Sequence, residues 1–82
     1  MNRCDATFRH GEFGPIVLTC TLLVQNHDED GNRDAGLLDV ELQTMLEVGL
    51  FCELSRNGAV NWKGTIGYID RDEATMWLKE ES

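Results

Sequence analysis

The sequence has few basic residues and no cluster of them. Seven Lys and Arg stand against fifteen Asp and Glu, so the formal net charge is -8. Proteins that bind nucleic acids or anionic membranes directly need a basic patch to neutralise phosphates. We therefore expect neither as a direct partner. The charge instead favours a protein partner with a basic surface.

Long apolar runs are also missing, since none approaches the roughly 20 residues that cross a bilayer. The first residues carry no apolar signal region, so we expect a cytoplasmic protein. The 82 residues fit one domain, 1-82. A domain of this size buries only roughly 60% of its unfolded surface. We therefore expect a homo-oligomer, because association adds buried surface to a thin core.

Cysteine and serine are too scarce to suggest covalent catalysis. Cys4, Cys20 and Cys52 are an odd number without short spacing, which predicts reduced thiols rather than a disulfide framework. Serine occurs only at Ser55 and Ser82, so the chain offers few candidates for the nucleophile of a Ser/His/Asp site. Among fifteen acids, any pair of carboxylates is uninformative. We expect a protein that is not an enzyme and needs no cofactor.

The clearest pattern is an alternation between Leu38 and Leu54. The even-numbered positions are aliphatic apart from Thr44 and Cys52, and most odd-numbered positions are polar. A period of two is typical of a strand with one buried face, so we predict a strand over 37-55.

A helix over 38-48 is the alternative, and it would make the fold α+β. Leu38, Leu42, Met45 and Leu46 follow helical spacing. We prefer the strand because it accounts for more residues.

The flanking segments are assigned by composition. The β-branched and aliphatic stretch 15-25 predicts a strand, and the polar stretch 26-36 predicts an acidic loop. Residues 59-69 predict a third strand. Residues 1-14 are interpreted as an N-terminal arm that ends in a turn. The segment 70-82 fits a C-terminal helix or a strand equally well.

An Asn-Gly pair at positions 57 and 58 predicts a hairpin. A loop from Arg56 to Gly58 pairs Leu54 with Val60 and joins the two apolar faces, whereas a two-residue loop pairs Ser55 with Val60 and mixes them. We therefore predict the three-residue loop. In the third strand, we assign Val60, Trp62, Ile66 and Tyr68 to the core face.

Glycines at 64 and 67 would allow that strand to curve. The predicted fold is mostly β, a small antiparallel sheet or meander rolled into a barrel or half-sandwich.

The acidic loop partly resembles a calcium-binding loop. Asp30, Asn32, Asp34 and Glu41 fall at positions 1, 3, 5 and 12 of such a loop. Ala35 stands where the sharp turn needs glycine, and a strand precedes the loop where a helix is required. Calcium binding through 30-41 is a minor hypothesis.

A binding function is the main hypothesis. The odd-numbered face of the predicted strand 37-55 carries acids around two apolar residues, and Trp77 would point outward on a strand. The predicted partner-binding residues are Asp39, Glu41, Gln43, Met45, Glu47, Phe51, Glu53 and Trp77. We expect a non-enzymatic domain that binds a basic protein, for example as an inhibitor that occupies a nucleic-acid-binding surface. The alternative is a structural component acting through its own oligomer.

Overall fold

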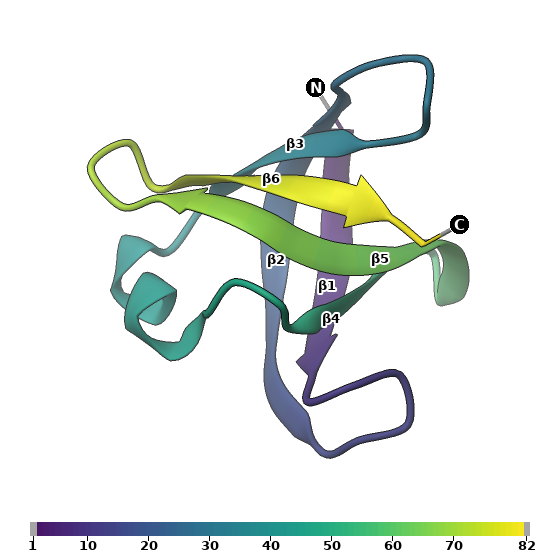
Figure 1. The fold of residues 1–82 in the computed structure, drawn as a ribbon, viewed down its shortest axis with the longest axis horizontal. Helices are drawn as coiled ribbons and strands as arrows, with labels where there is room; N and C mark the ends of the chain where they lie inside the picture. The colour runs from purple at the N-terminus through teal and green to yellow at the C-terminus, as the bar shows by residue number, and fades with distance from the viewer. Residues whose placement is uncertain (1, 82) are drawn as a thin grey trace.

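Six strands and one short helix make up the protein in a computed structural model that describes residues 2-81 (Figure 1). The elements in chain order are β1 (Asn2–Arg9), β2 (Ile16–Asn26), β3 (Arg33–Leu37), the 3-10 helix η1 (Val40–Met45), β4 (Phe51–Arg56), β5 (Ala59–Asp70) and β6 (Thr75–Glu80). No helix within residues 2-81 is long and apolar enough to cross a membrane.

The strands form a closed antiparallel barrel in the order β1-β2-β3-β6-β5-β4, with β4 returning to β1. Two three-stranded meanders, β1-β2-β3 and β4-β5-β6, are joined side by side where β3 pairs with β6 and β4 with β1. The prediction of a mostly-β barrel is confirmed. Closure gives every strand a neighbour on both sides, although the half of β2 before Leu22 pairs with β1 alone.

Alternating side chains fill the barrel. Phe8, Leu22, Leu54, Ile66 and Leu78 from five different strands are fully buried. No polar or charged side chain is buried among the described residues. The stability of this interior comes mainly from apolar burial, and the indole N–H of buried Trp62 is satisfied by the Gly31 carbonyl.

The predicted strand over 37-55 is wrong between 38 and 50. There the chain crosses one end of the barrel from β3 to β4 and carries η1. The Asp39 side chain accepts a hydrogen bond from the Glu41 N–H at 3.1 Å and starts η1 as its N-cap. Leu46 and Leu50 are buried and close this end. The alternative prediction, a helix over 38-48, is closer to the structure, although η1 is a 3-10 helix and covers only part of that range.

The predicted N-terminal arm is wrong, because residues 2 to 9 form β1. This strand pairs with β2 on one side and β4 on the other. Cys4, Ala6 and Phe8 alternate into the core. Two of these are small residues, which made the period of two hard to recognise.

The acidic loop is shorter than predicted, because Asn26 belongs to β2 and the residues from Arg33 to Gly36 belong to β3. In the C-terminal segment, which the sequence left open, the chain forms β6. A strand closes the barrel there by pairing with both β3 and β5.

The predicted three-residue hairpin loop is also wrong. Asn57 and Gly58 form a two-residue turn with φ of 54° and 81°, as a type I′ turn requires. Ser55 pairs with Val60, as expected for a two-residue loop. Asn61 is then an extra residue in a β-bulge, so Leu54 still pairs with Trp62. The bulge therefore keeps these two apolar side chains on the same face of the sheet.

Two bulges reverse the orientation of β5 at its ends. Gly67 is the extra residue of a second bulge, between Ile66 and Tyr68. Trp62 and Ile66 therefore point inward as predicted, whereas Val60 and Tyr68 are 50% and 61% exposed, against the prediction.

Candidate functional site

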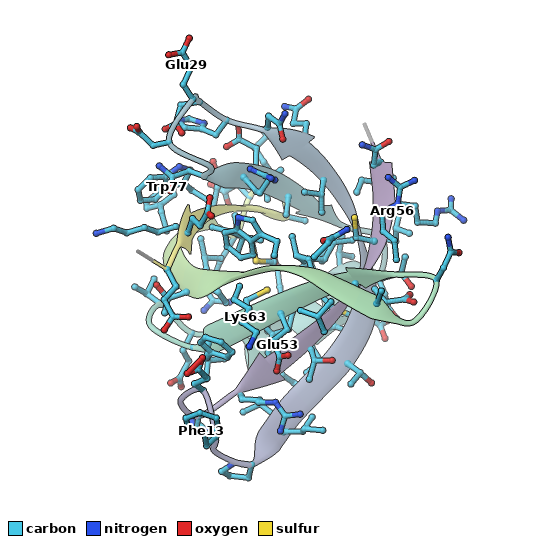
Figure 2. The ribbon with its side chains drawn as sticks, turned by 90° about the vertical axis from the view of Figure 1, so that its right-hand side faces the viewer. Phe13, Glu29, Glu53, Arg56, Lys63 and Trp77 are labelled. Carbon is cyan, nitrogen blue, oxygen red and sulfur yellow. The ribbon has the colours of Figure 1, made fainter. Side chains whose placement is uncertain are left out.

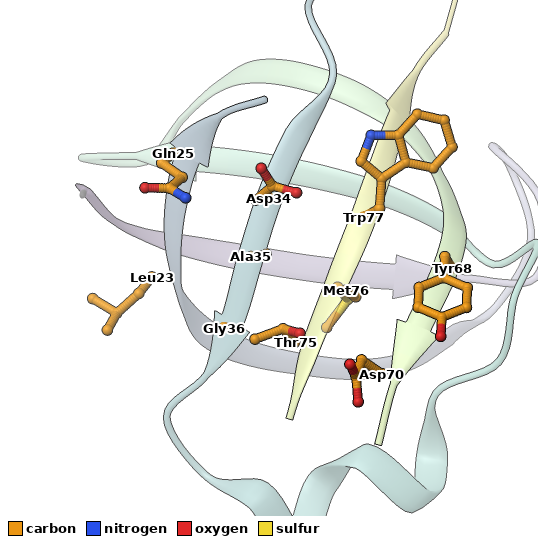
Figure 3. A pocket seen from close by; sticks show the side chains of 10 residues that line it. All are labelled: Leu23, Gln25, Asp34, Ala35, Gly36, Tyr68, Asp70, Thr75, Met76 and Trp77. Atoms are coloured by element: carbon orange, nitrogen blue, oxygen red, sulfur yellow. The ribbon is translucent and has the colours of Figure 1, made fainter. Parts of the chain in front are cut away.

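A groove runs across the outer face of four neighbouring strands, β2, β3, β6 and β5 (Figure 3). Strand register builds it from two parallel rows of outward-facing residues. The first row is Leu23, Gly36, Thr75 and Asp70. The second row is Gln25, Asp34, Trp77 and Tyr68. The groove has a volume of about 440 Å³.

Two glycines shape this groove. Gly36 lies in the middle of the first row, and nothing fills the space that a side chain there would occupy. The Trp77 ring packs directly against Gly67, where a Cβ atom would collide with it. The bulge at Gly67 thus supports the indole, and Gly36 leaves open floor beside it.

Aromatic and acidic side chains meet in the groove. Tyr68 and Trp77 are neighbours across β5 and β6, and the carboxylates of Asp34 and Asp70 lie on either side of them. Electron-rich ring faces attract cations, and nearby carboxylates add to that attraction. The groove is chemically suited to a cationic side chain such as that of Lys or Arg.

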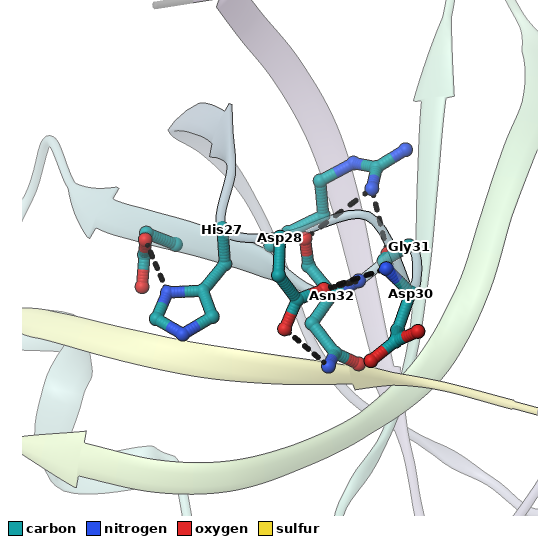
Figure 4. Close-up of polar contacts among 7 residues, drawn as sticks. His27, Asp28, Asp30, Gly31 and Asn32 are labelled. Atoms are coloured by element: carbon teal, nitrogen blue, oxygen red, sulfur yellow. Dashed lines mark hydrogen bonds and ion pairs between the residues drawn. The ribbon is translucent and has the colours of Figure 1, made fainter.

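His27 lies against this groove. Its Nδ1 atom is 2.8 Å from a carboxylate oxygen of Asp34 (Figure 4), and its ring meets the Trp77 ring edge-on at 5.9 Å. The hydrogen bond to Asp34 raises the pKa of His27 above 6.5. The Trp77 indole N–H is buried without a hydrogen-bond partner among the described residues.

Five of the predicted partner-binding residues lie on the crossover rather than on a sheet face. They are Asp39, Glu41, Gln43, Met45 and Glu47. The β5–β6 turn holds this segment near the Asp70 end of the groove, because Arg71 donates to the Gln43 carbonyl at 2.7 Å and the Leu46 carbonyl at 3.0 Å. The exposed crossover acids therefore extend the negative charge of the groove.

The other three predicted residues are separated from one another. Phe51 is buried on β4. Glu53 accepts from Arg9 at 3.0 Å and forms an ion pair within the barrel wall. Trp77 lies on β6 and points outward into the groove. Sequence reasoning missed Tyr68, because nothing indicated the bulge that turns it outward.

The four predicted calcium ligands are not brought together. Asp34 belongs to β3 and contacts His27, while Glu41 lies on the crossover at the other end of that strand. Within residues 2-81, no group of three or more His, Cys, Asp or Glu side chains is arranged to hold a metal ion.

The loop is instead organised by Asp28, which the sequence did not single out (Figure 4). Its carboxylate accepts from the backbone N–H groups of Asp30 and Asn32 and from the Asn32 side chain. The side-chain bond from Asn32 is the main reason why the pKa of Asp28 is lowered. An acidic side chain here closes a turn.

The cysteines are free thiols. Burial raises the pKa of the Cys20 thiol to about 11, and it raises the pKa of Cys52 still further. The thiolate is the nucleophilic form, so these two groups are poorly reactive at neutral pH.

Comparisons with known proteins add no relative. No protein-family model matches the chain, and searches of curated proteins and of solved structures found no similar protein or structure.

Proposed function

We propose that the protein is a small, non-enzymatic interaction domain that binds a basic surface of a partner protein. The observation that carries the proposal is the groove, where Trp77 and Tyr68 lie between Asp34 and Asp70. A lysine or arginine side chain of the partner enters this groove, and the acids of the crossover contact the basic residues around it.

The net charge of -8 supports this function, because it steers a basic partner toward the domain. One form of the function is an inhibitor that occupies the nucleic-acid-binding surface of its partner. Free thiols fit the reducing cytoplasm, where we place the protein as part of the proposal.

The test is calorimetric titration with a lysine-rich peptide, with a glutamate-rich peptide of equal length as the control ligand. Tyr68→Ala removes an exposed ring, and Asp70→Asn removes a charge while keeping an oxygen that can accept from the Asp72 and Glu73 N–H groups. Each should weaken binding about threefold to tenfold.

Glu29→Gln is the matched control, because Glu29 lies at the tip of the β2–β3 loop outside the groove (Figure 2) and its change also removes one negative charge. It should weaken binding less than about twofold, as expected for a distant screened charge. Equal losses in Asp70→Asn and Glu29→Gln would show general charge attraction and reject the groove.

A structural component acting through its own oligomer is the second candidate. Every strand already has a neighbour on both sides in the barrel, so we place the self-association contact on side chains. Leu38, Val40, Met45 and Val48 on the crossover are exposed apolar residues and provide the surface for such a contact. Light scattering across protein concentrations tests it, because Val48→Asp should dissociate the oligomer. A monomeric mass at every concentration rejects it.

A further inference from the structure

The two ends of the barrel differ. Leu46 and Leu50 close the crossover end, whereas the opposite end opens into a cavity of about 460 Å³. The floor of this cavity is the top of the core, formed by Cys4, Val24 and Leu54 together with Trp62. We call this cavity the mouth.

The rim of the mouth is basic and amide-rich in a chain that is otherwise acidic. It carries Asn2, Asn26, Arg33, Arg56 and Asn61, and none of the residues that line the mouth is Asp or Glu. These positions continue the inward alternation of their strands, apart from the bulge residue Asn61. With fifteen acids in the chain, a lining without any acid is a local reversal of charge.

The two arginines belong to strands on opposite sides of the mouth. Arg33 is on β3 and Arg56 is on β4, and two strands separate β3 from β4 in either direction around the barrel. Amide side chains lie between them on the β1 and β2 side, and Trp62 lies on the β5 side. An anion in the mouth would thus be approached by guanidinium groups from opposite directions.

Contacts within the protein leave much of both guanidinium groups available. Nη1 of Arg33 donates to the Gly31 carbonyl at 2.6 Å, which holds the side chain by one nitrogen. The Trp62 indole donates to the same carbonyl at 2.7 Å and fixes the wall of the mouth. Arg56 makes no ion pair or side-chain hydrogen bond to another residue within 2-81, and its side chain is exposed (Figure 2).

We propose that the mouth binds the phosphate group of a small phosphate ester, independently of the groove and its basic partner. A phosphate dianion accepts hydrogen bonds from several directions, as opposed arginines and the amides between them require, whereas a planar carboxylate is satisfied by one guanidinium. The organic part of the ester packs against the small exposed parts of Cys4 and Trp62 at the floor. The mouth volume suits a small organic molecule.

The test uses phenyl phosphate, inorganic phosphate and benzoate at constant ionic strength, with binding followed by calorimetry and by amide NMR shifts at the rim. Phenyl phosphate should bind at least threefold more tightly than inorganic phosphate, because its ring reaches the apolar floor. Both should bind more tightly than benzoate. If benzoate binds as tightly as phenyl phosphate, the assignment to phosphate is overturned.

Arg56→Gln and Arg3→Gln form a matched pair, because each removes one positive charge from an exposed side chain and only Arg56 lines the mouth. Arg56→Gln should weaken phenyl phosphate binding at least tenfold, and Arg3→Gln less than about twofold.

Asn61→Asp, which places an acid on the rim, should abolish binding by repulsion. Equal effects of the two arginine variants, or unchanged binding in Asn61→Asp, would overturn the site. Because the lysine-rich peptide uses the groove, its binding should be unaffected by Arg56→Gln, so the two proposals fail separately.

Discussion

His27 reports on the charge of the groove. Its hydrogen bond to Asp34 stabilises the imidazolium, and the negative charges of Asp34 and Asp28 act in the same direction, so its pKa in the folded protein lies above 6.5 although partial desolvation opposes this. Protonated His27 therefore contributes to the stability of the folded protein. This contribution is fully present below pH 6.5 and is lost as the pH rises through the higher pKa that His27 has in the folded protein.

Asp34→Asn should move the pKa of His27 back toward 6.5, because the amide carries no charge and holds the imidazolium less strongly. Proton NMR of the ring during a pH titration measures this. A His27 curve that does not change between the two proteins would contradict the contact with Asp34.

At the scale of single residues, the sequence predicted orientation only where the strand was regular. Trp77 points outward because Met76 and Leu78 on either side are buried. Tyr68 was assigned to the core because plain alternation from Ile66 puts it there. The bulge at Gly67 adds one residue and turns it outward, and a glycine does not by itself reveal a bulge.

Among the elements, the crossover explains why the strongest sequence pattern was misleading. On the face that the alternation predicts to be buried, Leu46, Leu50, Cys52 and Leu54 are buried, whereas Leu38, Val40 and Val48 are exposed. Leu46 and Leu50 close the end of the barrel from an irregular segment, and only Cys52 and Leu54 lie on a strand. The conformation of 38-50 depends on the Asp39 cap and the Arg71 contacts, which connect it to the rest of the fold, and an alternating pattern does not reveal these contacts.

Leu46→Ala should destabilise the protein by about 2–3 kcal/mol, because it opens a cavity at the closed end. Val48→Ala is the control on the same segment: Val48 is 61% exposed, and its truncation should cost less than about 0.5 kcal/mol. Urea denaturation followed by tryptophan fluorescence measures both. If the two variants unfold at the same urea concentration, Leu46 does not stabilise the barrel by closing its end.

For the whole molecule, the sequence predicted a sheet rolled into a barrel or half-sandwich, but it did not show which strands close the barrel. Closure depends on β1 pairing with β4 and β3 with β6, contacts between residues far apart in the chain. The polar residues of β1 concealed the strand that completes the wall. Both binding surfaces proposed above result from this closure, since the groove spans four strands and the mouth is the open end of the ring.

The charge of the whole molecule should also limit its stability. Among residues 2-81, ion pairs join only Arg9 to Glu53, His27 to Asp34 and Lys63 to Glu12, so most acids face solvent without a basic partner. Arg3→Glu adds to this excess on an exposed side chain of β1. It changes the net charge from -8 to -10, since one positive charge is replaced by one negative charge.

At about 20 mM NaCl, Arg3→Glu should lower the free energy of unfolding by about 0.5–1 kcal/mol, because the added charge is repelled by the other acids. At about 0.5 M NaCl the difference should nearly disappear, since salt then screens interactions beyond roughly 4 Å. Urea denaturation at the two salt concentrations measures it. A loss that is equal at both would instead mean that Arg3 stabilises the barrel through local packing, and that repulsion among the acids is not what limits stability.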